Sequence, residues 1–314
     1  MRAGGARLGA FVDRQLSVLF VAPAFVVLLI ILVGPFGYMM WTAFTDLSFA
    51  LPGHDGNFVG FANFRRLMHD SFFWDSFFLT LRFVVAAVSI EFLLGFAVAL
   101  LIYHQVTRQR LVLTALLVPM MLAPVAVGLI WKLLLQGDFG MLTYYLRAVG
   151  LLGIDQAVLS DAPLVFPAII AIDVWEWTPF VVLVLLAGLM SLPREPFEAA
   201  VMDGANRYQV FRDVTLPLLR PIVALVVLLR SIDAFKEFDK VFILTGGGPG
   251  TTTELLSIYT YRMNFKDWDL GYGAACAFMV YLVVLILCAV FHKAVFWQEG
   301  RVSAPAPEPV AVTA

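Results

Sequence analysis

Residues 164–190 read LVFPAIIAIDVWEWTPFVVLVLLAGLM, and this stretch decides the class of fold. It is longer than the about 20 apolar residues that a helix needs to cross a bilayer. The whole chain has the same character, because 61% of its 314 residues are hydrophobic and only 14% are charged. Soluble domains average about 45–50% apolar and about 25% charged residues. The composition therefore excludes a soluble globular protein and predicts an all-α, polytopic membrane protein.

The other apolar runs have similar lengths and are separated by polar segments. We expect six transmembrane helices, at residues 16–41, 79–103, 111–135, 164–190, 219–235 and 273–296. Proline falls inside several of these runs, and a spanning helix tolerates proline when neighbouring helices satisfy the freed backbone groups. The run at 16–41 is too long for a signal peptide and no cleavage site follows it, so we expect a retained helix.

The distribution of Lys and Arg predicts the orientation of these helices. Basic residues are more frequent in the N-terminal tail, the connections at 104–110 and 191–220, and the C-terminal tail than in the alternate loops. The positive-inside rule then places both termini in the cytoplasm. We expect a cytoplasmic tail at 1–15, a transmembrane domain at 16–298 and a disordered, Pro/Ala-rich tail at 299–314.

One outer loop has a helical pattern of its own. Its apolar residues recur at steps of three and four, at Phe58, Phe61, Phe64, Leu67 and Met68. This period is typical of a short helix in the outer membrane interface with Arg65 and Arg66 towards water. Periodicity alone favours a membrane anchor over a partner-binding segment.

The cytoplasmic loop at 191–220 is about thirty residues long and reads as two helices. Proline at 193 and 196 can open the first helix, and Glu198 in its first turn suits the helix dipole. Residues Phe197, Ala200, Val201 and Gly204 share one face, which has small side chains at its centre. Such a helix can enter a groove of another protein, and spacing alone leaves a packed linker equally open.

The second helix of this loop has a start and an end signal. Gly204 allows the chain to turn, and Asn206 can cap the next helix with Gln209 three residues on. We expect this helix to end at Pro217.

The same loop resembles the EAA loop of ABC importer permeases. Residues 198–205 read EAAVMDGA, and Phe211 and Leu216-Pro217 follow at the positions of that motif. Three further stretches resemble the carbohydrate-importer branch: FVGFANF at 58–64, WEWTPF at 175–180 and LTGGGP at 244–249. The LTGGGP stretch is more similar to the first permease of such systems than to the second.

The resemblance implies a permease subunit of the bacterial inner membrane that forms a heterodimer with a second permease. It also implies two cytoplasmic ATPase subunits and an extracytoplasmic solute-binding protein as partners. The coupling helix that docks on the ATPase subunit would carry Glu198, Ala199, Ala200, Asp203 and Gly204. The chain would bind no cofactor itself and be no enzyme, since ATP and Mg²⁺ would lie in the ATPase subunits.

Charged residues within the apolar runs are candidates for a solute path. Asp173, Glu176 and Trp177 share one face of the fourth predicted helix, and Arg230 and Asp233 share a face of the fifth. Carboxylates and a guanidinium can bond sugar hydroxyls, and an indole can stack on a sugar ring. The alternative is an ion-pair cluster, Arg230 with Asp173 or Glu176, that only holds two helices together.

Other functions have weaker support in the sequence. The GGGPGTTT stretch at 246–253 lacks the Lys of a P-loop. The four His residues are too dispersed in the sequence to indicate a metal site. The net charge of −2 gives no case for nucleic-acid binding. A secondary transporter that uses Glu91, Asp173 or Glu176 as a proton site is the main rival, and a scaffold subunit is a distant third.

Overall fold

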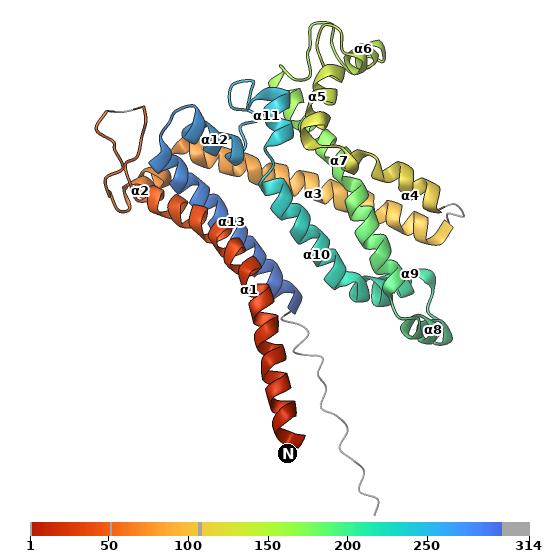
Figure 1. Ribbon diagram of the computed structural model, residues 1–314. Helices are drawn as coiled ribbons and strands as arrows, with labels where there is room; N and C mark the ends of the chain where they lie inside the picture. Colours follow the sequence, from red (N-terminus) through yellow and green to blue (C-terminus); the bar gives the residue numbers. More distant parts are fainter. Residues whose placement is uncertain (1, 51, 106–108, 297–314) are drawn as a thin grey trace, which may run out of the picture. The chain divides into compact units, whose positions relative to one another are not determined.

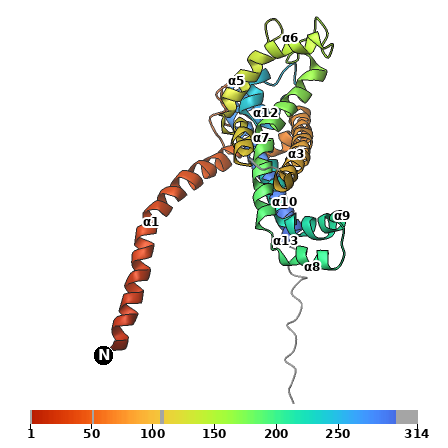
Figure 2. The ribbon, with the colours of Figure 1, turned by 90° about the vertical axis from the view of Figure 1, so that its right-hand side faces the viewer.

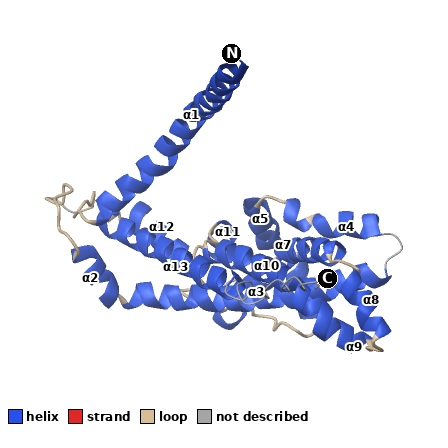
Figure 3. Ribbon diagram, turned by 90° about the horizontal axis from the view of Figure 1, so that it is seen from below, coloured by secondary structure: helices blue, strands red, loops and turns tan. Residues whose placement is uncertain are grey.

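The computed structural model of the chain describes residues 2–50, 52–105 and 109–296. Within these residues all the regular secondary structure longer than an isolated β-bridge is helical, and Figure 3 shows helices and loops only. The elements are α1 (Arg2–Ala43), α2 (Ala62–His69), α3 (Ser71–Gln105), α4 (Gln109–Leu117), the 3₁₀ turn η1 (Pro119–Met121), α5 (Pro124–Leu134), α6 (Met141–Ala148), α7 (Ala162–Ser191), α8 (Glu195–Met202), α9 (Arg207–Val210), the π-helical turn η2 (Phe211–Thr215), α10 (Leu216–Phe235), α11 (Asp239–Thr245), α12 (Leu256–Phe265) and α13 (Leu270–Phe296).

Five helical segments are long and apolar enough to cross a membrane, which confirms the prediction of an all-α, polytopic membrane protein. They are Phe20–Ala43, Ser71–His104, Ala162–Ser191, Arg207–Phe235 and Leu270–Phe291. Prolines 23, 35, 167 and 179 lie inside α1 and α7 without ending either helix. Figure 2 shows α1 as one uninterrupted helix from its first described residue.

The predicted helix at 111–135 is not a single helix. It is divided into α4, η1 and α5, and the break coincides with Pro119 and Pro124. Ala123 is extended, with ψ 137°, because the ring of a following proline disfavours the helical region. Pro124 then starts α5, where its missing N–H breaks no hydrogen bond.

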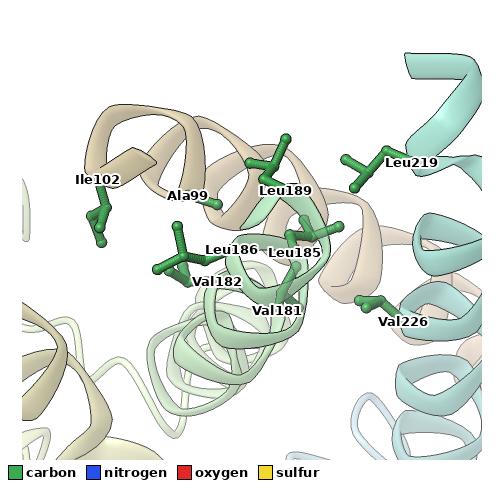
Figure 4. Packing of buried hydrophobic residues seen from close by; sticks show 9 residues of the cluster. All are labelled: Ala99, Ile102, Val181, Val182, Leu185, Leu186, Leu189, Leu219 and Val226. Atoms are coloured by element: carbon green, nitrogen blue, oxygen red, sulfur yellow. The ribbon is translucent and has the colours of Figure 1, made fainter. Parts of the chain in front are cut away.

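The larger of two compact units comprises the described residues of Ser71–Tyr259 and Val280–Ala314, and α3, α7 and α10 pack together within it (Figure 1). Small residues permit this close packing: a Cβ added at Gly95 would lie 2.7 Å from Val181, and one at Gly188 would lie 2.8 Å from Ile222. Figure 4 shows the apolar core between these helices. Its buried members are Ala99, Ile102, Val181, Val182, Leu185, Leu186, Leu189, Leu219 and Val226.

The smaller unit comprises Met1–Asp70 and Thr260–Met279. The helix expected over residues 58–68 is α2, and Asn63 at its start donates hydrogen bonds to the carbonyls of Ala43 and Thr45 at 2.9 and 2.8 Å. Arg66 is not only turned towards water, because it also pairs with Asp269 at 2.6 Å. These contacts hold α2 against the end of α1 and the start of α13.

The structure can be compared with only one of the two predicted tails. Residue Arg2 already begins α1, so the segment expected as an N-terminal tail at 1–15 is helical from there on. The C-terminal tail predicted at 299–314 lies outside the described residues.

Candidate functional site

The loop at 191–220 folds into the two helices that the sequence predicts. The first, α8, begins at Glu195, with Pro196 in its first turn and Glu198 close to its positive end. Gly204 follows with φ at +78°, a left-handed conformation that favours glycine. This turn separates α8 from α9 and sets the direction in which α8 leaves the bundle.

The second helix begins with the predicted capping box. The Asn206 side chain accepts from the Gln209 N–H at 3.0 Å, and the Gln209 side chain accepts from the Asn206 N–H at 2.8 Å. The expected end at Pro217 is wrong, because the helix continues through η2 into α10. In this wider turn the Leu216 N–H donates to the Phe211 carbonyl five residues back, and Pro217 falls in the first turn of α10, where its missing N–H is tolerated.

Helix α8 presents charged, small and apolar side chains to solvent. Of the predicted coupling residues, Glu198, Ala199, Asp203 and Gly204 are exposed, and Ala200 is half-buried. The large apolar residues Val201 and Met202 are 65% and 87% exposed. Sequence periodicity did not single out Met202, since it lies off the face that Phe197 and Ala200 share. We define the exposed part of α8 and the following turn, residues 198–204, as the coupling segment.

A groove of about 990 Å³ lies between this segment and the neighbouring helix ends. Leu100 and Tyr103 of α3 and Leu189 of α7 form one side, while Phe197 and Val201 of α8 form part of the other. The coupling segment therefore stands away from the bundle on one edge of a concave, largely apolar surface.

A second site lies inside the bundle and is built around Arg230 of α10. Its guanidinium donates to both carboxylate oxygens of Glu91 on α3, at 2.7 and 2.9 Å, and to Asp173 on α7 at 3.0 Å. All three side chains are almost fully buried. A paired, bidentate geometry is what a buried guanidinium requires.

Lys240 of α11 extends this cluster to a fourth helix. Its ammonium bonds Asp173 and forms ion pairs with Glu176 at 2.7 Å and Glu237 at 3.2 Å. Lys240 is only 2% exposed. We call the set of Glu91, Asp173, Glu176, Arg230, Glu237 and Lys240 the ion network.

The ion network contains more acidic than basic groups. Burial raises the pKa of Glu237 to about 7, although Lys240 acts in the opposite direction. Burial alone would lower the pKa of Lys240, but Asp173, Glu237 and Glu176 hold it above its ordinary value. Lys240 therefore stays charged and serves as a fixed cation among the carboxylates.

The predicted path residues separate into two groups. Asp173, Glu176 and Arg230 come together in the ion network, where each is about 1% exposed, so they line no open cavity in this conformation. Trp177 is half-buried, and the Arg230 guanidinium lies 4.7 Å from its ring centroid. Asp233 does not join the network, because it is 51% exposed and pairs with Lys236 at 3.4 Å.

Two members of the ion network were not predicted from the sequence. Glu237 and Lys240 follow the fifth apolar run and read as loop residues there. The available signal was their spacing of three among Phe238, Val241 and other apolar residues, which is typical of a short buried helix. Glu91 was recognised as an ionisable group in a span, without its partner Arg230.

Comparisons with known proteins identify the family of the chain. Residues 91–303 match the family model of the binding-protein-dependent transport system inner membrane component. A probable ABC transporter permease of Sinorhizobium fredii is 38% identical, with 86% of each chain covered. The trehalose/maltose transport system permease MalF of Thermococcus litoralis is 32% identical and covers 90% of this chain and 94% of its own. A chain of a bacterial ABC transporter involved in the import of the acidic polysaccharide alginate shares the fold, at a TM-score of 0.77, 23% identity and coverage of 95% and 100%. The chain belongs to the family of binding-protein-dependent transport system inner membrane components.

Proposed function

We propose that the chain is a permease subunit of an ABC importer for a sugar or sugar derivative. Relatives named for trehalose and maltose and a fold neighbour named for alginate support the solute class. In this proposal the chain pairs with a second permease to form the path. Two cytoplasmic ATPase subunits hydrolyse ATP with Mg²⁺, and an extracytoplasmic binding protein delivers the solute.

The exposed coupling segment is the observation that carries this proposal. A short helix with Ala199 on its surface and Met202 at 87% exposure suits a cleft in a partner protein, because small residues permit close approach and Met adapts to the contact. Glu198, Ala199, Ala200, Asp203 and Gly204 would contact the ATPase subunit. Movement of α8 with that subunit would pass along α9 and η2 into α10.

The proposed topology places the chain in the bacterial inner membrane with both termini in the cytoplasm. The broken segment α4–η1–α5 would provide the sixth crossing beside the five long helices. Helix α7 has 30 residues and a length of about 45 Å, enough to separate its two ends across a bilayer. The coupling segment follows one end of α7, and α6 precedes the other (Figure 1).

For the solute path, we retain Trp177 and Asp233 as the lining candidates and assign a supporting role to Asp173, Glu176 and Arg230. A residue buried within one subunit cannot line a cavity between two subunits unless the subunit opens. The ion pairs also give these carboxylates a basic partner, which favours a structural role over the proton carrier of a secondary transporter.

The test is uptake by the complete complex in proteoliposomes. We expect accumulation of a labelled sugar only when ATP is enclosed with the ATPase subunits and the binding protein is outside. An ionophore that collapses the proton gradient should leave the uptake unchanged, and the chain purified alone should hydrolyse no ATP. Uptake driven by a proton gradient without ATP would contradict the proposal and favour the secondary transporter.

A further inference from the structure

The loop between α5 and α7 carries a compact group of exposed apolar side chains outside the candidate spans. Phe139, Met141, Tyr144 and Tyr145 are 57–69% exposed. They line a common hollow of about 360 Å³, and the rings of the two tyrosines pack edge to face with centroids 5.5 Å apart. We call these four residues and their hollow the α6 platform. Such a surface on a loop indicates a binding site.

The loop beneath the platform is held in one shape by its own hydrogen bonds. Arg147 donates to the carbonyls of Gly137 and Gln156, each at 2.8 Å, and so ties the two sides of the loop together. Gly140 at the start of α6 is buried, and an added Cβ would lie 2.4 Å from the Gln136 carbonyl oxygen. The aromatic side chains therefore stand on a preorganised support, which lowers the entropy lost on binding.

The charges around the platform distinguish between a membrane surface and a protein. A helix that lies on a bilayer carries Lys and Arg on its polar face to meet anionic lipid. Here the one basic residue of α6, Arg147, is occupied by backbone carbonyls. The exposed Asp138 lines the hollow, and Asp155 is exposed nearby in the chain. Tyr, Phe and Met at the centre with an acidic side chain, Asp138, at the edge are typical of a protein interface.

The position of the α6 platform along α7 indicates on which side of the membrane its partner lies. Helices α6 and α8 lie at opposite ends of α7 in both Figure 1 and Figure 2. If the coupling segment faces the ATPase subunits in the cytoplasm, the α6 platform faces the other side of the membrane.

We propose that the α6 platform docks the extracytoplasmic solute-binding protein, with an apolar side chain of that protein in the hollow and basic residues facing Asp138. This inference rests on the proposed function. Tyr144 and Tyr145 are the anchors, and Asp138 provides the charge complementarity that orients the partner.

The experiment measures ATP hydrolysis of the complete complex as the cognate binding protein is titrated. The double variant Tyr144→Ala/Tyr145→Ala should raise the half-maximal concentration of binding protein about tenfold, with the basal rate unchanged. Asp138→Lys should raise it as well, and more strongly at low salt than at high salt. Phe78→Ala, which removes an aromatic ring that is 51% exposed on α3, is the matched control and should have no effect.

The outcomes separate this inference from the function on which it rests. A wild-type complex that the binding protein does not stimulate would overturn both. A stimulated wild type with unshifted tyrosine and aspartate variants would overturn the docking site alone. A lower melting temperature of the tyrosine variant in lipid nanodiscs, with normal stimulation, would assign the platform to the membrane surface instead.

Discussion

The ion network and the coupling segment both carry charged residues, but their surroundings are opposite. In the network Arg230 is 1% exposed and satisfied by carboxylates from two helices. In the coupling segment Glu198 and Asp203 are exposed, and no ion pair to either is found among the described residues. Buried charges must be paired within the subunit, whereas exposed charges remain available to another protein. We therefore expect changes in the network to affect the stability of the bundle, and changes in the segment to affect the binding of partners.

The largest effect is expected from breaking the network at its centre. Arg230→Met would leave the buried Glu91 without its guanidinium partner, and loss of one member of a buried pair costs about 3–5 kcal/mol. We expect a marked drop in the melting temperature of the purified complex. The double variant Arg230→Met/Glu91→Met should recover much of this loss, because it removes both charges. A complex of normal stability with Arg230→Met alone would show that the network holds nothing together.

The turn of the coupling segment should affect transport rather than stability. Gly204→Val forces a β-branched residue into a left-handed conformation, which costs about 1–2 kcal/mol and changes the direction of α8. Nothing lies within 4 Å of an added Cβ, so a clash is not the cause. We expect ATP-driven uptake to fall about tenfold with normal assembly of the permease pair. Gly204→Asn is the control, since Asn tolerates this conformation; equal uptake by all three proteins would contradict the role of the turn.

A smaller effect is expected from the pH dependence of Glu237. Its pKa is raised from 4.5 to about 7, mainly by burial, so the folded chain binds this proton more tightly than the unfolded chain. The stabilisation from this group is fully present below about pH 4.5 and is lost as the pH rises through about 7. Melting temperatures of the wild-type complex across this range should fall with rising pH. Glu237→Gln should flatten the fall, and an unchanged slope would contradict the assignment.

The smallest effect is expected at an exposed ion pair on the same segment of chain. Lys236 and Asp233 are 55% and 51% exposed and lie 3.4 Å apart. Exposed pairs contribute about 0–1 kcal/mol, so Lys236→Ala should leave the melting temperature nearly unchanged. This variant sharpens the comparison with Arg230→Met, since both remove a basic partner of a carboxylate. A large loss of stability with Lys236→Ala would show that burial is not what distinguishes the two sites.

The sequence predicted the helical class and the local signals of the coupling loop well. Hydrophobic runs define long helices, and the exchange of hydrogen bonds between Asn206 and Gln209 is a local property of four residues. The break at Pro119 and Pro124 was missed, because proline inside a span is compatible with both a continuous and a divided helix.

The ion network was less predictable, because its members are far apart in the sequence. The pairing of Glu91 with Arg230 joins residues 139 positions apart, and no local pattern connects them. Lys240 lies outside the apolar runs, and only packing in three dimensions buries it among Asp173, Glu176 and Glu237. The surroundings of the predicted path residues were equally hard to predict. The sequence shows that they share one face of a helix, but not whether that face meets a cavity or another helix.

The most direct test asks whether a single surface variant of α8 still binds the ATPase subunits. It tests the claim that the coupling segment serves partner binding, whereas the ion network serves stability. Ala199 is exposed on α8, so Ala199→Arg disturbs no packing within this chain but blocks close approach by a partner. Co-purification through a tag on this chain should recover the second permease at the wild-type level and a wild-type melting temperature. The ATPase subunits should be lost, together with ATP-driven uptake. Full retention of the ATPase subunits and normal uptake with Ala199→Arg would contradict the assignment of α8 as the coupling helix.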